Sequence, residues 1–215
     1  MLLELLFPRR CLFCGRVLAS GEKDLCLPCM VGQRYNNSLI EKYDYLITEM
    51  PYEHLDIFLN YNKCKEAIIN FKYRQNIYSG RTLGGMWARH LESMEWMKDI
   101  DAIVPVPLHW RKLLKRGFNQ SEYLGRILSK QTGKPLVTNA IRRHVNNNPQ
   151  VESDNRWDNV DGIFSAKDLS LIANKHILIV DDVITTSATI NNLLKVIKKA
   201  KNTKVSLAFL SSNMP

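Results

Sequence analysis

The sequence predicts an α/β fold, a mostly parallel sheet with flanking helices, preceded by a small zinc-binding module that contains four cysteines. Residues 177–180 form a β-branched apolar run that is typical of a buried central strand. An amphipathic helical pattern and a second strand-like run follow it, which is the order of a parallel strand–helix–strand unit. Two Cys-x-x-Cys pairs near the start of the chain predict the separate metal module.

Length and composition allow one large domain or a domain with a small module, since 215 residues with 45% hydrophobic content can form a substantial core. We expect the zinc-binding module in residues 1–50 and the α/β domain in residues 51–215. The apolar start contains Glu4 and lacks the positive start and cleavage site of a signal peptide. No stretch reaches the roughly 20 apolar residues that span a bilayer, so we expect a soluble, cytoplasmic chain without membrane insertion.

The cysteines of the module are Cys11, Cys14, Cys26 and Cys29, two knuckles separated by eleven residues. Each knuckle can present two thiolates to one ion, and two knuckles complete the tetrahedral four-sulfur shell that Zn²⁺ prefers. A closed shell has no position for water, so we expect a structural role. Disulfides are disfavoured because the chain lacks secretion features. A thioredoxin-like redox pair is disfavoured because two pairs occur together and neither has a strand-to-helix context.

In the α/β domain, strands are expected over residues 102–106, 177–180 and 205–210. A first helix is indicated by apolar residues at helical spacing, which are Leu83, Met86, Trp87, Leu91 and Met94. A second helix, between the last two strands, is indicated by Ile190, Leu193, Leu194 and Ile197. We expect both apolar faces to pack into the core.

Two adjacent carboxylates, Asp181 and Asp182, follow the central strand. The carboxyl end of such a strand is where α/β sheets place their ligands, and a carboxylate pair can hold a vicinal diol. The hydroxyl-rich turn that opens the next helix can bind a phosphate with its hydroxyls, its backbone N–H groups and the helix dipole. Its residues are Thr185, Thr186, Ser187 and Thr189. The alternative is an ordinary strand, turn and capped helix.

The net charge of +9 is unevenly placed along the chain. Residues 1–50 carry six basic and six acidic residues, whereas residues 105–143 carry nine basic residues and one acid. Five lysines follow Asp182 with no acid among them, and they are Lys195, Lys198, Lys199, Lys201 and Lys204. This asymmetry favours phosphorylated ligands or nucleic acid, although the C-terminal lysines can equally form a solvated helix face.

Two further segments suggest chemistry. After the strand at 102–106, prolines are followed by Arg111, Lys112, Lys115 and Arg116, whose charges suit a pyrophosphate. The alternative for this segment is the start of a basic, capped helix. Residues 141–164 lack apolar periodicity, and a long polar connection in a compact domain is usually functional or disordered. The candidate residues in this second segment are Arg142, Arg143 and Arg156.

The acidic pair and its Thr-Thr turn resemble the phosphoribosyl pyrophosphate (PRPP) signature of type I phosphoribosyltransferases, except that Ser187 replaces a glycine. The cysteine quartet, the Val-Pro-Val-Pro-Leu segment, Arg-Gly-Phe-Asn-Gln at 116–120 and Phe-Lys-Tyr-Arg at 71–74 extend the resemblance to the ComF family over nearly the whole chain. The resemblance implies a type I phosphoribosyltransferase-like fold and a role in handling incoming DNA. It also implies that the acidic pair contacts the ribose hydroxyls, that the turn binds the 5′-phosphate, and that a mobile loop at 141–164 closes over the site.

The main interpretation is therefore a protein that binds PRPP, or a related ribose phosphate, with Mg²⁺ and acts in DNA uptake, natural transformation or nucleotide metabolism. If it transfers a phosphoribosyl group, Asp181, Asp182, Arg111 and Arg116 are the candidate catalytic residues. The alternative is a non-catalytic accessory protein of the uptake machinery that binds single-stranded DNA. Its candidate stacking residues are Trp110, Phe118, Tyr123 and Trp157. A third interpretation is that the zinc module docks DNA uptake or helicase proteins. The acceptor substrate is not identified by the sequence.

Overall fold

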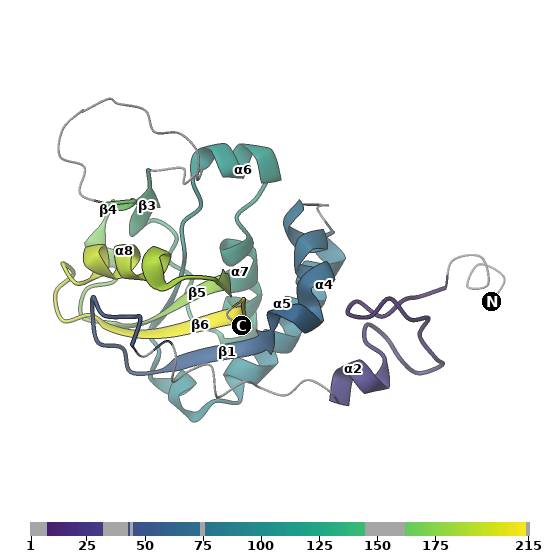
Figure 1. The fold of residues 1–215 in the computed structure, drawn as a ribbon. Coiled ribbons are helices and arrows are strands. Elements are labelled where there is room, and N and C mark those ends of the chain that lie inside the picture. Colours follow the sequence, from purple (N-terminus) through teal and green to yellow (C-terminus); the bar gives the residue numbers. More distant parts are fainter. Residues whose placement is uncertain (1–7, 32–42, 44, 74–75, 145–161, 214–215) are drawn as a thin grey trace.

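The computed structural model describes residues 8–31, 43, 45–73, 76–144 and 162–213. Its centre is a four-stranded sheet in the order β1-β6-β5-β2, and each pair of neighbouring strands is parallel. The strands are β1 (Leu55–Asn60), β2 (Ala102–Pro105), β5 (His176–Ile184) and β6 (Lys204–Ser212). Helices cover both faces of this sheet (Figure 1). The predicted α/β class with a parallel sheet is confirmed.

One face of the sheet is covered by α4 (Tyr61–Tyr73), α5 (Ile77–Glu92) and α7 (Gln120–Thr132). The predicted apolar positions Leu83, Trp87 and Leu91 of α5 are fully buried there. The helix ends at Glu92, so Met94 lies beyond it and precedes the short helix η1 (Glu95–Asp99). The apolar spacing therefore predicted the buried face of this helix but extended it too far.

The opposite face is covered by α8 (Ser187–Ile197), whose predicted core residues Ile190, Leu193, Leu194 and Ile197 are at most 1% exposed. In β5, Ile177 and Ile179 belong to this core, whereas Leu178 and Val180 belong to the core on the other face. Because side chains alternate along a strand and both faces are covered, the strand needs a continuous apolar run. This explains the pattern at residues 177–180.

The structure differs from the prediction in the length and number of its strands. β5 continues beyond Val180 to Ile184, because its ladder with β6 extends through the pairs Asp181–Phe209 and Ile184–Ser212. The edge strand β1 was not predicted. It is a short segment, Leu-Asp-Ile-Phe-Leu-Asn, whose polar residues weaken the apolar pattern of a buried strand.

The elements near the carboxyl ends of β2 and β5 are short. They are α6 (Trp110–Arg116) and the antiparallel pair of β3 (Ile141–Arg143) and β4 (Phe164–Ala166). The short helix η2 (Leu169–Leu171) follows β4 and leads to the amino end of β5. Figure 1 shows α6 and this pair above the sheet. The expected polar connection thus begins with a short strand. Most of it, including Arg156 and Trp157, lies outside the described residues, as does the expected loop closure.

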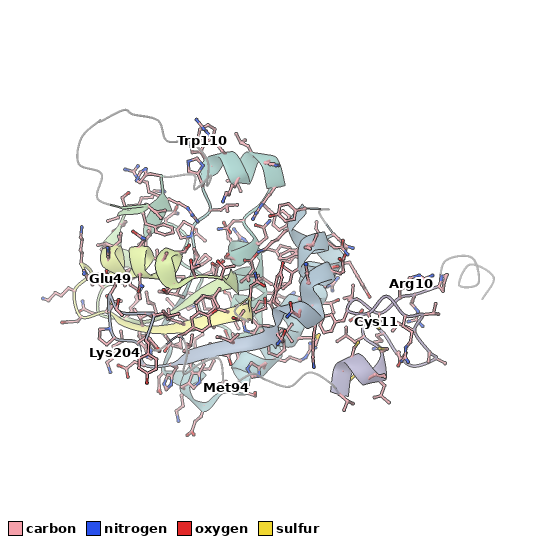
Figure 2. The ribbon with its side chains drawn as sticks, viewed as in Figure 1. Arg10, Cys11, Glu49, Met94, Trp110 and Lys204 are labelled. Atoms are coloured by element: carbon pink, nitrogen blue, oxygen red, sulfur yellow. The ribbon has the colours of Figure 1, made fainter. Side chains whose placement is uncertain are left out.

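The cysteine-rich segment, residues 8–31 with the short helix α2 (Leu27–Val31), lies beside α4 and α5, at the far end of the molecule from Glu49 and Lys204 (Figures 1 and 2). Leu12 and Phe13 pack against both its own small core and the large core under α5. Tyr43 is buried in the core of the sheet, and its hydroxyl lies 2.8 Å from that of Ser212. The boundary near residue 50 stays a prediction. None of the described helices is long and apolar enough to cross a membrane.

Candidate functional site

A cavity of about 480 Å³ lies at the carboxyl end of β5. Both carboxylates of the predicted motif, Asp181 and Asp182, line it, and Asp182 is 93% buried. Three of the four predicted hydroxyl residues line it as well, namely Thr185, Thr186 and Thr189. Its other polar or charged lining residues are Lys112, Arg116, Asn119, Gln120, Ser121 and Arg143. The cavity therefore joins a carboxylate pair, a hydroxyl-rich turn and three cations.

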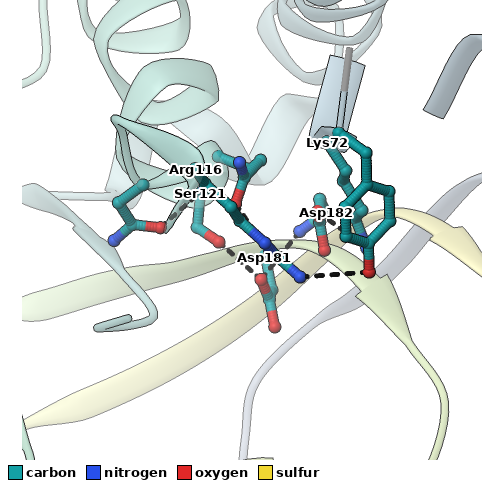
Figure 3. A network of polar contacts seen from close by, with 8 residues as sticks. Lys72, Arg116, Ser121, Asp181 and Asp182 are labelled. Atoms are coloured by element: carbon teal, nitrogen blue, oxygen red, sulfur yellow. Dashed lines mark hydrogen bonds and ion pairs between the residues drawn. The ribbon is translucent and has the colours of Figure 1, made fainter. Parts of the chain in front are cut away.

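Side chains from two distant helices hold the carboxylates in place (Figure 3). Ser121, in the first turn of α7, donates a hydrogen bond from its Oγ to Asp181 Oδ1 at 2.5 Å. Asp181 Oδ1 also accepts a hydrogen bond from the Asp182 backbone N–H at 2.9 Å. Lys72, in the last turn of α4, places its Nζ 2.9 Å from Asp182 Oδ2.

Burial and neighbouring charges shift the pKa values of Asp181 and Lys72. Burial raises the pKa of Asp181 to about 6, and the adjacent Asp182 carboxylate adds to the rise, while Ser121 and Lys72 oppose it. Burial alone would lower the pKa of Lys72, but the Asp182 and Asp181 carboxylates more than offset it and the net shift is upward. Lys72 therefore stays positively charged at neutral pH, whereas Asp181 takes up a proton more readily than an ordinary aspartate.

Cations form another wall of the cavity. The Arg116 guanidinium donates to Gln120 Oε1 at 2.9 Å and to the Tyr73 hydroxyl at 3.2 Å, and it lies over the Tyr73 ring at 5.0 Å. Burial lowers the pKa of Lys112, and the nearby Arg143 and Arg116 charges lower it further. A lysine whose pKa is lowered by other cations in the same cavity is typical of a site that is completed by an anion.

The turn after β5 places a helix N-terminus at the cavity. Thr186 is the N-cap of α8, and its side chain makes no capping hydrogen bond, so its hydroxyl is not committed to the helix. Ser187 is the first residue of α8 and does not line the cavity. It is not among the described residues with positive φ, so serine at this position needs no left-handed backbone.

Arg111 is the predicted catalytic residue that the fold does not bring to this cavity. α6 begins at Trp110, and its N-cap His109 accepts a hydrogen bond from the Arg111 backbone N–H at 3.2 Å. Residues four apart share one side of a helix, so Lys112 and Arg116 both reach the cavity. The guanidinium of Arg111 instead lies 5.3 Å from the Trp110 ring centroid, on an exposed side chain. Its catalytic role stays a prediction.

Of the two candidate arginines in β3, Arg142 and Arg143, only one lines this cavity. Arg143 lines the cavity of the carboxylates, and its guanidinium lies over the Phe164 ring at 5.3 Å. Arg142 donates from Nε to Ser165 Oγ at 3.1 Å and lines a neighbouring cavity of about 310 Å³. Alternation along the strand explains why only one of these adjacent arginines reaches the main cavity directly.

Sequence reasoning missed the roles of Lys72, Ser121 and Gln120. Lys72 belongs to a stretch that contributed to the family resemblance, and Gln120 ends the Arg-Gly-Phe-Asn-Gln stretch. No local pattern indicates their function, because their partners lie elsewhere in the fold. Ser121 is 60 positions from the carboxylate that it contacts.

The four predicted zinc ligands form a separate cluster, outside the lining of this cavity. The sulfur atoms of Cys11, Cys14, Cys26 and Cys29 lie within 4.8 Å of one another, and Cys14 Sγ is 3.7 Å from Cys26 Sγ. A tetrahedral shell with metal–sulfur bonds of about 2.3 Å separates its sulfurs by about 3.8 Å. Burial would raise the pKa of the Cys11 thiol, but backbone hydrogen bonds at Cys14 and Cys26 help lower it to about 6. The spacing of the four sulfurs fits a metal ion.

Comparisons with known proteins agree with this architecture. Residues 119–214 match the Phosphoribosyl transferase domain family, and this segment includes Ser121, the carboxylate pair and the turn. Competence protein F of Haemophilus influenzae (strain Rd) is 26% identical over 211 residues, which cover 90% of this chain and 92% of that protein. The similarity therefore extends over most of the chain.

Two solved structures show a distant likeness. The glutamine PRPP amidotransferase of B. subtilis aligns with a TM-score of 0.46 and 18% identity, over 66% of this chain and 30% of that one. The adenine phosphoribosyl transferase of Trypanosoma brucei aligns with a TM-score of 0.41 and 13% identity, over 81% and 67%. The chain is therefore similar to Competence protein F over most of its length, and it matches the Phosphoribosyl transferase domain over residues 119–214.

Proposed function

We propose that the cavity at the end of β5 binds PRPP, or a related ribose phosphate, together with Mg²⁺. The observation that carries this proposal is the arrangement of a buried carboxylate pair, a hydroxyl-rich helix N-terminus and several cations around one cavity. A sugar diol, a terminal phosphate and a pyrophosphate need these three kinds of partner. The matched domain family supports the same assignment.

In this proposal each wall of the cavity holds one part of the ligand. Asp181 and Asp182 accept hydrogen bonds from the ribose hydroxyls, and the turn from Thr185 to Thr189 holds the 5′-phosphate at the N-terminus of α8. Arg116 and Lys112 face the pyrophosphate, which they orient and partly neutralise. Mg²⁺ bound with PRPP would supply further neutralisation of the pyrophosphate charge.

The same arrangement can support transfer of the phosphoribosyl group. A nucleophile would attack the anomeric carbon as the bond to pyrophosphate breaks, and the departing pyrophosphate would carry away the electron pair. The chain would contribute by positioning the ligand and stabilising its charge. The name of the Haemophilus relative supports a place for this protein in competence, and hence beside the DNA uptake machinery and its helicase.

Calorimetric titration with PRPP and Mg²⁺ tests the binding proposal. We expect saturable binding by the wild-type protein and loss of binding in the Asp181→Asn/Asp182→Asn double variant, which removes both charges with little change in shape. Glu95→Gln is the matched control, because the side chain of Glu95 is 90% exposed and belongs to η1, whose residues do not line the cavity. Absence of wild-type binding at millimolar PRPP would rule the proposal out.

A second candidate function, binding of single-stranded DNA, is favoured by the surface of α6. Trp110 is 57% exposed beside Arg111 and can stack on a base. Phe118 and Tyr123 are poor stacking candidates, because they pack against Phe71 at 5.3 and 5.4 Å. The C-terminal lysines are partly neutralised, since Lys195, Lys198 and Lys204 pair with Glu49 or Glu53.

This second function is tested with a fluorescent oligothymidylate at several salt concentrations. If it is correct, binding weakens steeply with salt, and Trp110→Ala lowers the affinity about fivefold or more. Leu114→Ala is the control, because Leu114 is another exposed apolar residue of α6. Excess PRPP as competitor shows whether the two ligands share a site. Absence of binding at low salt would remove this candidate.

We further propose that the cysteine cluster holds one structural Zn²⁺. The sulfur separations support a four-thiolate shell, which leaves no position for a substrate or water. Elemental analysis of the purified protein should give about one zinc per chain, and Cys26→Ser should lower that ratio. A ratio near zero in protein purified without chelators would contradict the proposal.

A further inference from the structure

The cation that contacts the carboxylate pair comes from an unexpected part of the chain. Lys72 lies in α4, 110 residues before Asp182, outside the matched domain at 119–214. The side chains of the pair are 18% and 10% exposed, so their attraction is screened much less than that of a surface ion pair. The site that receives a sugar diol in our proposal therefore already contains a positive charge.

The position of Lys72 is fixed by the packing of α4. The preceding residue, Phe71, is fully buried and packs against Phe118 and Tyr123. The following residue, Tyr73, accepts a hydrogen bond from Arg116 and lies under its guanidinium. The last turn of α4 thus holds Arg116, which faces the pyrophosphate in our proposal, and places Lys72 beside the carboxylates.

A fixed ammonium group beside two adjacent carboxylates offsets the repulsion between their charges. Without a cation, the two acids repel each other, and burial disfavours ionisation of both. A divalent ion often meets this need in sites that bind sugar phosphates, but such an ion must be bound from solution. Lys72 offers three N–H donors within the fold, and Asp182 occupies one of them at 2.9 Å.

We propose that Lys72 is a positioning residue that acts as a built-in cation, so that the chain binds the ribose 5-phosphate part of its ligand without a divalent metal. This inference rests on the proposed function and deepens it. Lys72 holds Asp182 as a charged, oriented acceptor for the ribose hydroxyls. The requirement for Mg²⁺ is then confined to ligands that also carry a pyrophosphate.

The test compares ribose 5-phosphate binding in metal-free buffer and with added Mg²⁺, by calorimetry. Buffers are freed of divalent ions on a resin, so that no chelator reaches the cysteine cluster. For the wild-type protein we expect affinities that agree within about threefold. Lys72→Met should lose about tenfold or more in metal-free buffer and recover part of that loss with Mg²⁺, whereas Lys72→Arg should keep most of the metal-free affinity.

Lys112→Met is the matched control, because it removes one lysine charge from the lining of the cavity, and the pKa of Lys112 is lowered by burial and by neighbouring cations rather than shifted by the carboxylates. Its loss of affinity should be equal with and without Mg²⁺. If Lys72→Met does not fold, the wild-type measurement alone decides. A tenfold or greater dependence of wild-type ribose 5-phosphate binding on Mg²⁺ would overturn the inference while leaving the proposed function intact. Failure of the wild-type protein to bind either PRPP or ribose 5-phosphate under any condition would overturn both.

Discussion

Ionisation of Asp181 is opposed by burial and by the neighbouring Asp182 charge, and Ser121, Lys72 and the Asp182 backbone N–H offset part of that cost. A site that binds a diol through two carboxylates therefore maintains an unfavourable charge arrangement when it is empty. Such a conflict between folding and binding is common at functional sites. Asp181 is the residue at which it can be measured.

We predict that Asp181→Asn raises the melting temperature at pH 7.5 by about 2–4 °C. The folded-state pKa of Asp181, about 6, lies above its ordinary value of 3.8, so the folded state retains the proton longer than the unfolded state does. The contribution of this group to stability is therefore complete below pH 3.8 and is lost as the pH rises through about 6. The asparagine stays neutral, so its advantage should shrink at pH 5. Thermal unfolding at both pH values measures this, with Glu95→Gln as the control, and a lower melting temperature at pH 7.5 would contradict it.

Ser187 provides a second prediction at the residue scale. Because Ser187 starts α8 without a positive φ and does not line the cavity, we expect that its Cβ does not narrow the proposed phosphate site. We expect Ser187→Gly to change PRPP affinity by less than about threefold, measured by calorimetry with Mg²⁺. A gain of tenfold or more would show that the serine weakens the phosphate-binding turn.

The carboxylates and the threonines could be predicted because they follow one another directly at the end of a single strand. Lys72 and Ser121 could not, because each reaches the site from a helix whose position depends on the tertiary fold. Arg111, in contrast, was predicted at the site but does not line the cavity. Four basic residues near one another in sequence suggested a common site, but a helix of only seven residues turns Arg111 away from Lys112 and Arg116.

At the scale of elements, α5 is held against α4 by a close contact at Gly80. A Cβ at this position would overlap the ring of Phe71, which is fully buried. Gly85, in the same helix, has no such neighbour, since its Cβ would come no closer than 3.6 Å to the Arg89 side chain. Alanine substitutions at the two glycines therefore distinguish the effect of the packing contact from the effect of helix propensity.

We predict that Gly80→Ala lowers the free energy of unfolding by about 1–3 kcal/mol, because the Phe71 ring must move within a packed core. Gly85→Ala should instead raise it by about 0.5–1 kcal/mol, because alanine restricts the unfolded chain and favours the helix. Urea unfolding of both variants gives the comparison. Equal effects of the two substitutions would mean that the contact between α4 and α5 does not constrain this helix.

Elements with strong local patterns were predictable, and those fixed by tertiary contacts were not. The continuous apolar run in β5 and the apolar face of α8 identified the centre of the sheet. β1 carries an aspartate and an asparagine within six residues, so its sequence does not show the pattern of a buried strand. Its place in the sheet depends on its pairing with β6. The pair of β3 and β4 has three residues in each strand, too few for any periodicity to be visible.

At the scale of the whole molecule, the cysteine-rich segment and the sheet differ greatly in what stabilises them. The two faces of the sheet each carry a large apolar core, whereas Cys11, Leu25 and Cys26 are the buried residues of the small cluster around the sulfurs. So small a core cannot offset the entropy of ordering a segment of this length without a metal. The segment contacts the sheet domain through Leu12, Phe13 and Met86, and the Tyr78 hydroxyl donates to Asp24.

We therefore predict that removal of the metal unfolds residues 8–31 while the sheet stays folded. With an excess of a strong zinc chelator, trypsin should cut at Arg16 and Lys23, and mass spectrometry should still find a resistant fragment that contains the sheet. Cys26→Ser should show the same cleavage without the chelator. Cys64→Ser should not, because that thiol is buried in α4 and donates to Asn60 O, away from the other four. Protection of Arg16 and Lys23 in chelator would show that packing against α5 alone holds the module. Loss of the resistant fragment would show instead that the metal stabilises the sheet through this contact.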